Sequence, residues 1–136
     1  NISEKGKPVL DDILFSKTGS IGYCALVNTN EKFVITQNAA RLNFKETFVN
    51  IIFALYYLKS RSIQTLAKKS AHGNAIKDLQ LSVMKKFPFP LPPLSLQKQF
   101  AKKIINLEQL KVKNSLALTK HNQLFDSLKS QSFSMN

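Results

Sequence analysis

The stretch Lys86-Phe-Pro-Phe-Pro-Leu-Pro-Pro93 divides this 136-residue sequence into two parts of different character. Its prolines alternate with apolar residues, and because proline has no backbone N–H, only an edge strand or a polyproline segment accommodates the stretch. The residues before it mix β-like runs with helical patterns, whereas a long segment after it contains neither proline nor glycine. The sequence therefore predicts a small strand-rich α+β domain over residues 1–93, a long helix over residues 94–130 and a tail over residues 131–136.

Several short strands are predicted near the N-terminus. Asp12–Ser16 is a β-like run, Lys17–Ser20 has the composition of a turn, and Ile21–Val27 resumes a run of β-branched and aromatic residues. Together these segments predict a hairpin. After a second turn at Asn28–Glu31, the apolar run Phe33–Thr36 is predicted as a further strand.

Two helices are predicted to follow these strands. Asn43 and Glu46 have the spacing of a capping box, and the apolar residues of Phe48–Leu58 recur at helical spacing on most sides, as in a buried helix. A shorter helix is predicted over Ile63–Ser70, and Gly73 is placed to end it. The globular part is thus expected to pack helices against its strands.

The segment from Leu96 to about Leu128 is predicted to be one helix of roughly 48 Å, at 1.5 Å per residue, with Ser95 as its N-cap. One face of this helix carries a stripe of mostly apolar residues that the globular part is too small to cover, so the stripe requires a partner helix. We expect this partner to be another helix of a longer protein, or the same helix of a second protomer in a homodimer. Residues at heptad-like spacing form the stripe: Leu107, Leu110, Asn114, Ala117, His121, Leu124 and Leu128.

The sequence is strongly basic, with 20 lysine and arginine residues against 8 aspartate and glutamate residues and a formal net charge of +12. Such an excess on a small protein indicates a polyanionic partner. Nucleic acid fits better than a lipid surface, because the apolar stripe of the long helix is narrow and the sequence has no tryptophan. No apolar run approaches the ~20 residues of a transmembrane helix, so no membrane partner is expected.

No catalytic or metal-binding pattern is recognisable. Cys24 is the single cysteine, and we interpret it as a small buried apolar residue. With only one cysteine the chain cannot form an internal disulfide, which fits the reducing cytoplasm. Cys24 has no metal-ligand spacing with His72 or His121. Asp11 and Asp12 are adjacent, but neighbours on a strand point to opposite faces and make a poor acid–base pair. The sequence lacks a phosphate-binding glycine loop. We therefore expect no metal, no bound cofactor and no catalysis by this chain.

Two basic and polar segments are candidate nucleic-acid contacts. Lys17–Ser20 presents a cation, hydroxyls and glycine at a hairpin tip, which suits a groove and its phosphates, although an ordinary solvated turn has the same composition. Lys68–Lys77 groups similar side chains at a helix end, where a solubilising terminus is the alternative. The amides of Gln37-Asn38, which follow a predicted strand, could read adenine or could satisfy backbone groups. The candidate DNA-binding residues are Lys17, Thr18, Ser20, Asn38, Lys68, Lys69, His72, Asn74 and Lys77.

Four short motifs occur in an order that resembles a known protein family. They are Asp12-Ile-Leu-Phe-Ser-Lys-Thr-Gly-Ser-Ile-Gly22, Val34-Ile-Thr-Gln-Asn38, Ile76-Lys-Asp-Leu79 and Phe89-Pro-Leu-Pro-Pro-Leu-Ser-Leu-Gln97. In this order they resemble the hairpin, the following strand and the junction into a long helix in target-recognition domains. These domains occur in specificity (S) subunits of type I restriction–modification systems. The resemblance covers about residues 10–128.

Two positions depart from the family pattern. Asp11 stands where the pattern has glycine, and Leu96 stands where it has glutamate. Target-recognition domains also carry further strands upstream. We therefore expect this chain to begin midway through such a domain and to lack part of its base-reading surface.

The resemblance implies a non-catalytic DNA-recognition subunit in the cytoplasm of a bacterium or archaeon. In such subunits, antiparallel long helices separate two recognition domains, each of which reads half of a split DNA site. The helices dock methyltransferase (M) subunits, which use S-adenosylmethionine and connect to the restriction (R) subunit. By this resemblance, Lys17–Ser20 and Lys69–Lys77 are the expected DNA-facing regions. The alternative is a helical assembly module that docks M subunits or self-dimerises and binds DNA weakly.

Overall fold

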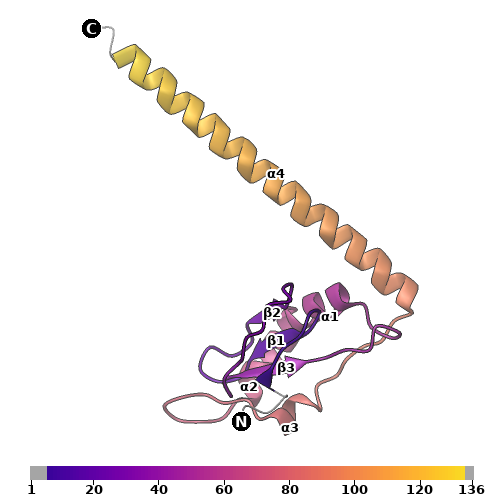
Figure 1. The fold of residues 1–136 in the computed structure, drawn as a ribbon. Coiled ribbons are helices and arrows are strands. Elements are labelled where there is room, and N and C mark those ends of the chain that lie inside the picture. Colours follow the sequence, from indigo (N-terminus) through magenta and orange to yellow (C-terminus); the bar gives the residue numbers. More distant parts are fainter. Residues whose placement is uncertain (1–5, 134–136) are drawn as a thin grey trace. The chain divides into compact units, whose positions relative to one another are not determined.

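The computed structural model describes residues 6–133, and contacts divide the chain between Lys98 and Gln99 into two compact units. Among these residues, the first unit holds a small sheet and three short helices, and the second lies within one long helix (Figure 1). The expected α+β fold is confirmed. The elements in chain order are β1 Ile13–Ser16, β2 Cys24–Leu26, β3 Ala39–Leu42, α1 Ile51–Leu58, α2 Arg61–Ser70, α3 Leu81–Met84 and α4 Leu94–Phe133.

β1 is the central strand of an antiparallel sheet with the order β2-β1-β3. Phe15 of β1 pairs in register with Cys24 of β2 on one side and with Ala40 of β3 on the other. Alternate residues of a strand point to the same face, and Ile13 and Phe15 are completely buried in the core. The predicted hairpin is therefore confirmed, and its first strand supplies the centre of the core.

The third strand differs from the prediction, because it comprises Ala39–Leu42 rather than Phe33–Thr36. In its actual position the strand buries the small Ala40 and brings the Arg41 side chain to a buried carboxylate, that of Asp12. Strand preference depends strongly on such neighbours. The more apolar segment therefore forms a partly exposed connection, and the segment with better tertiary partners pairs with β1.

The Asp12 carboxylate is completely buried and ties together three parts of the first unit. It accepts hydrogen bonds from the Val9 backbone N–H at 2.8 Å and from Asn43 Nδ2 at 2.9 Å. It also accepts one from Arg41 Nε, with which it forms an ion pair. These bonds connect the N-terminal segment, β3 and the segment after β3 to the start of β1.

Asp11, the exposed neighbour of this carboxylate, has a left-handed backbone conformation with φ +65°. Glycine adopts this region freely, whereas a side chain is strained there and a β-branched one most of all. We expect Asp11→Gly to leave the free energy of unfolding unchanged or to raise it by up to about 1 kcal/mol, and Asp11→Val to lower it by about 1–2 kcal/mol. Urea denaturation checks this, and equal losses in both variants would contradict it.

The start of α1 corrects a second prediction. The capping box of Asn43 and Glu46 does not form, and the helix begins at Ile51 with Asn50 as its N-cap. Asn50 Oδ1 accepts the N–H groups of the second and third helical residues, both at 3.1 Å. Asn43 caps no helix because residues 44–50 form a turn and an irregular segment, and its Nδ2 group donates to Asp12.

α2 confirms the predicted second helix and begins two residues earlier, at Arg61. Ile63 and Ala67 are buried on its inner face, while Lys68 and Lys69 are exposed in its last turn. The separation of these faces matches the amphipathic pattern of a surface helix. The exposed basic end leads directly into the loop before α3.

The proline-rich stretch is irregular and is held in place by aromatic contacts. The Phe89 ring centroid lies 5.0 Å from that of Tyr57, 5.4 Å from that of Phe44 and 6.2 Å from that of Phe53. The Tyr57 hydroxyl also donates a hydrogen bond to the Pro88 carbonyl oxygen at 2.7 Å. Aromatic pairs of this kind add to the burial of their surface. The stretch is therefore a packed part of the first unit.

α4 extends further at both ends than the predicted Leu96–Leu128. It begins at Leu94, so Ser95 lies inside the first turn and is not the N-cap. Residues 131–133, expected to belong to a tail, continue the helix, and residues 1–5 and 134–136 lie outside the described residues. Every residue from Ile105 to Phe133 is exposed.

The first turn of α4 is fastened to the start of α1 by Gln97, whose side chain is 1% exposed. Gln97 Oε1 accepts the Asn50 N–H at 2.9 Å. Gln97 Nε2 donates to the carbonyl oxygens of Phe48 at 3.0 Å and Pro92 at 2.7 Å. The buried amide is fully bonded, and residues 94–98 consequently belong to the first unit.

Candidate nucleic-acid interface

Segments that are distant in the sequence meet at the turn between β1 and β2. The Lys17 N–H donates to the Asn38 carbonyl oxygen at 2.8 Å, and the Lys17 carbonyl oxygen accepts the Leu79 N–H at 2.7 Å. The Gly19 N–H donates to the Lys77 carbonyl oxygen at 2.8 Å. The turn that contains Lys17–Ser20 is therefore fixed against the loop between α2 and α3, so the two predicted basic segments lie together.

Asp78 holds this junction, a role that no pattern in the sequence indicates. Its Oδ1 accepts hydrogen bonds from the Thr18 hydroxyl at 2.5 Å and from Lys17 Nζ at 3.0 Å. The Thr18 bond is the largest cause of a lowered Asp78 pKa, and the Lys17 bond and charge act in the same direction. The carboxylate is therefore ionised at neutral pH. The Lys17 side chain is only 16% exposed and its charge is paired, so Lys17 and Thr18 position the loop.

A hollow of about 330 Å³ lies beside this turn. It is lined by Lys68 from α2, Lys77 from the loop and Ser20 of the turn. Tyr23, which is 75% exposed, also lines it. Cations, hydroxyls and backbone groups are the usual partners of nucleic-acid phosphates. Sequence reasoning missed Tyr23, although an exposed aromatic residue next to a basic turn is a common feature of nucleic-acid surfaces.

The other candidate residues lie outside this hollow. Lys69, His72 and Asn74 are exposed at the end of α2 and in the following loop, and Asn38 is exposed before β3. The backbone of His72 pairs with Asp78, which leaves its ring at the surface. The predicted set is thus divided into residues that line the hollow, exposed residues outside it, and residues that fix the loop in place.

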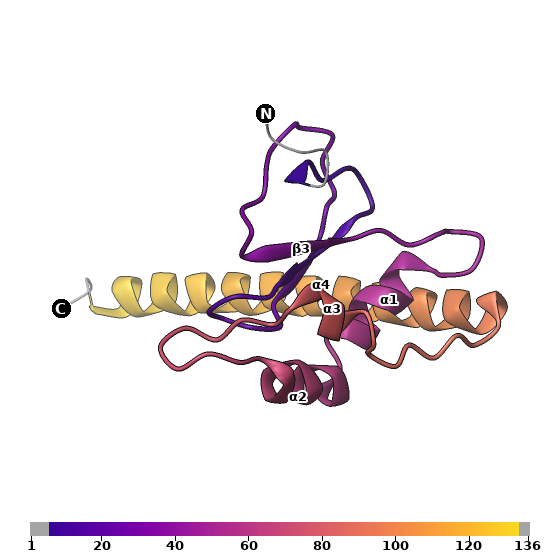
Figure 2. The ribbon, with the colours of Figure 1, turned by 90° about the horizontal axis from the view of Figure 1, so that it is seen from below.

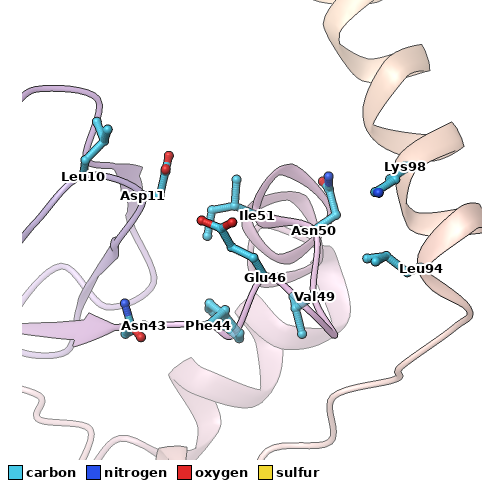
Figure 3. Close-up of a pocket in the computed structure, with 10 residues that line it drawn as sticks. All are labelled: Leu10, Asp11, Asn43, Phe44, Glu46, Val49, Asn50, Ile51, Leu94 and Lys98. Atoms are coloured by element: carbon cyan, nitrogen blue, oxygen red, sulfur yellow. The ribbon is translucent and has the colours of Figure 1, made fainter.

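A second hollow, of about 300 Å³, has a different character (Figure 3). Asp11 and Glu46 line it on one side, while Leu94 and Lys98 lie across from them in Figure 3. Its Asn50 side chain is already committed to the cap of α1. Two carboxylates repel a phosphate, so this hollow is the poorer site for a polyanion. Within residues 6–133, no group of three or more His, Cys, Asp or Glu residues is arranged to hold a metal ion.

Cys24 is half-buried and packs against the core, close to its predicted role. Burial raises the pKa of its thiol to about 11, an effect that the charge of Lys59 partly offsets. The thiol is therefore protonated at neutral pH and is a poor nucleophile. We expect alkylation by iodoacetamide near neutral pH to be at least about 100-fold slower in the folded chain than in urea, and its rate to rise about tenfold per pH unit before it levels off near pH 11. Equal rates in both states would contradict the burial.

In the part of the chain that the structure describes, no helix combines the length and the apolar composition needed to cross a membrane.

Comparison with known proteins agrees with the resemblance in the sequence. The family model described as the type I restriction modification DNA specificity domain matches residues 2–123. A solved structure, that of the type I restriction–modification system S subunit from M. genitalium, is similar with a TM-score of 0.62 and 24% sequence identity. That match covers 79% of this chain and 28% of the other chain, so this chain spans less than a third of that subunit. Because the family model covers nearly the whole sequence, the chain belongs to the family of type I restriction modification DNA specificity domains.

Proposed function

We propose that this chain recognises a sequence in duplex DNA as part of the specificity subunit of a type I restriction–modification enzyme. The observation that carries the proposal is the convergence of Lys68, Lys77 and Ser20 on one hollow, in a member of a DNA specificity family. The net charge of +12 supports a polyanionic partner. Lys68 and Lys77 would hold backbone phosphates, and the neighbouring loop would meet base edges.

The chain itself would perform no catalytic step and bind no cofactor. Its one fully buried carboxylate among the described residues, that of Asp12, is committed to structural hydrogen bonds, and its thiol is protonated. Methylation would belong to M subunits, which bind S-adenosylmethionine, and cleavage would belong to an R subunit recruited through them. The complex would act in the cytoplasm of a bacterium or archaeon.

The salt dependence of DNA binding tests this proposal. Each phosphate contact releases counterions, so the affinity of the chain for a fluorescent duplex should fall steeply between about 50 and 200 mM salt. The double variant Lys68→Ala, Lys77→Ala should bind more weakly and reduce the slope of log K against log salt by about two. The exposed pair Lys32→Ala, Lys45→Ala removes the same charge elsewhere and is the matched control. Absence of binding at low salt, or equal effects of both pairs, would contradict the proposal.

A second candidate function, helical assembly, rests on α4. Its residues from Ile105 onward are exposed, including large apolar side chains such as Leu110 and Leu124. Ile105, Val112 and Leu116 fall on the opposite side of the helix from the predicted stripe, at about 100° per residue. α4 therefore offers two apolar faces, which suits a partner helix on one side and an M subunit on the other. Polar Asn114 and His121 would set the register of pairing.

Light scattering over a range of concentrations tests self-pairing through α4. We expect the mass to approach that of a dimer as the concentration rises, and Leu110→Lys with Leu124→Lys to abolish this because charges would enter the seam. Gln109→Lys with Gln123→Lys adds the same charges one position away along the helix and should leave the dimer intact. A strict monomer at every concentration would exclude self-pairing and leave docking to another subunit as the role of this helix.

A further inference from the structure

The loop between α2 and α3 is a narrow projection closed at its base. The His72 N–H donates to the Asp78 carbonyl oxygen at 2.9 Å, and the Asp78 N–H donates to the His72 carbonyl oxygen at 2.7 Å. Between these residues the loop projects from the rest of the first unit, as both ribbon views show, although the Lys77 carbonyl oxygen accepts the Gly19 N–H at 2.8 Å (Figures 1 and 2). The projection has the width of a two-stranded ribbon, which the major groove of B-DNA, about 12 Å wide, can admit.

The loop is also fixed in shape. Gly73 has φ +124°, and a Cβ atom added there would come within 2.1 Å of the Ile76 carbonyl oxygen. The two sides of the loop therefore pack backbone against backbone. At its base, the Asp78 carboxylate is held by Lys17 and Thr18. A recognition element that is ordered before binding loses less conformational entropy in the complex.

The tip of this loop carries an apolar side chain in a basic surrounding. Ile76 is 66% exposed, Asn74 is exposed near it, and Lys77 follows it directly. Lys68 and Lys77 line the adjacent hollow. A large apolar group at the tip of a cationic loop gains little from the folded chain, but it fits the apolar feature of the major groove, the C5-methyl group of thymine.

We propose that Ile76 contacts a thymine methyl group in the major groove when the loop between His72 and Asp78 enters it. This inference rests on the proposed function and makes it specific, because it assigns Ile76 to base recognition and Lys68 and Lys77 to phosphate positioning. The contact would favour a T·A pair over the other pairs at one position of the DNA site. Loss of one buried methyl contact is expected to cost a factor of roughly 4 in affinity.

Selection followed by removal of single methyl groups tests the inference. A library of randomised duplexes is first enriched on the full wild-type chain. Each thymine of the enriched sequence is then replaced in turn by deoxyuridine, which keeps the base pair and removes only the methyl group. We expect one of these replacements to weaken binding of the wild-type chain about fourfold. The same replacement should not change binding by Ile76→Ala, which should bind the unmodified site about fourfold more weakly than wild type does. Val34→Ala, an exposed β-branched residue elsewhere, is the matched control and should behave like wild type.

The outcomes separate this inference from the proposed function. If no sequence is enriched, sequence recognition fails and the inference fails with it. If a sequence is enriched but every deoxyuridine duplex binds the wild-type chain as tightly as the original duplex does, the thymine contact is excluded while DNA recognition stands. The same conclusion follows if a replacement lowers the affinity of Ile76→Ala by the same factor as that of wild type. An enriched site without any A·T pair excludes the contact as well.

Discussion

Replacing Asp12 by Ala is expected to lower the free energy of unfolding by about 3–5 kcal/mol, which is a large part of the stability of a domain of this size. The carboxylate is completely buried and bonded to Val9, Arg41 and Asn43. Its removal leaves donors from three segments without this acceptor and takes away the carboxylate that is paired with the Arg41 guanidinium. Removing one member of a buried pair costs much more than the net value of the pair.

Urea denaturation followed by circular dichroism measures this effect, with Glu31→Ala as the control for removal of an exposed carboxylate. Asp12→Asn keeps the shape of the side chain and one acceptor oxygen, so we expect an intermediate loss of about 2 kcal/mol. If Asp12→Ala were as stable as Glu31→Ala, the carboxylate would not hold β3 and the N-terminal segment in place. A double-mutant cycle with Arg41→Leu isolates the ion pair from the other two bonds.

The hairpin could be predicted from the sequence because its signals are local. Turn residues at Lys17–Ser20 separate two β-branched runs, and such chemistry acts whatever the rest of the chain does. The third strand and the start of α1 could not be predicted in this way. β3 places Arg41 beside the buried Asp12 carboxylate, and α1 starts after Asn50, whose backbone N–H is bonded to the distant Gln97. Tertiary hydrogen bonds therefore outweigh the local sequence patterns, which favour other segments for the third strand and for the start of α1.

The sequence indicates some of the residues that line the candidate interface, but neither Tyr23 nor the arrangement of the others. Lys68 and Lys77 were marked by composition alone, but their meeting with Ser20 depends on backbone bonds between segments about 60 residues apart. The same contacts give Lys17 a structural role, since it faces a carboxylate that composition could not pair with it. Ile76 was part of a recognised motif, yet only the fold shows that this apolar residue is at the tip of a projecting loop.

Replacing Gln97 is expected to produce the second large effect, a loss of about 2–4 kcal/mol for Gln97→Ala. The buried amide satisfies one N–H group and two carbonyl oxygens, from Asn50, Phe48 and Pro92. Truncation leaves these groups unbonded in a site that is too enclosed for easy hydration. Amide hydrogen exchange should become faster at the N–H of Asn50 and in the first turn of α4. Gln99→Ala, two residues along the same helix and exposed, should change neither stability nor exchange.

Gln97→Glu discriminates the hydrogen bonds from simple filling of space, because glutamate has nearly the same volume as glutamine. The ionised carboxylate cannot donate to the carbonyl oxygens of Phe48 and Pro92, and burial also disfavours its charge, so its pKa should rise in the folded state. A carboxyl group whose pKa is raised by folding contributes its full stabilisation below its unfolded-state pKa. This contribution is lost as the pH rises through the folded-state pKa. The stability difference between Gln97→Glu and the exposed control Gln99→Glu should therefore be small near about pH 4.5 and grow towards about pH 8. A pH-independent difference would mean that the site recognises only the shape of the side chain, whereas the expected trend would show that the site at the first turn of α4 excludes a charged side chain in the position of the Gln97 amide.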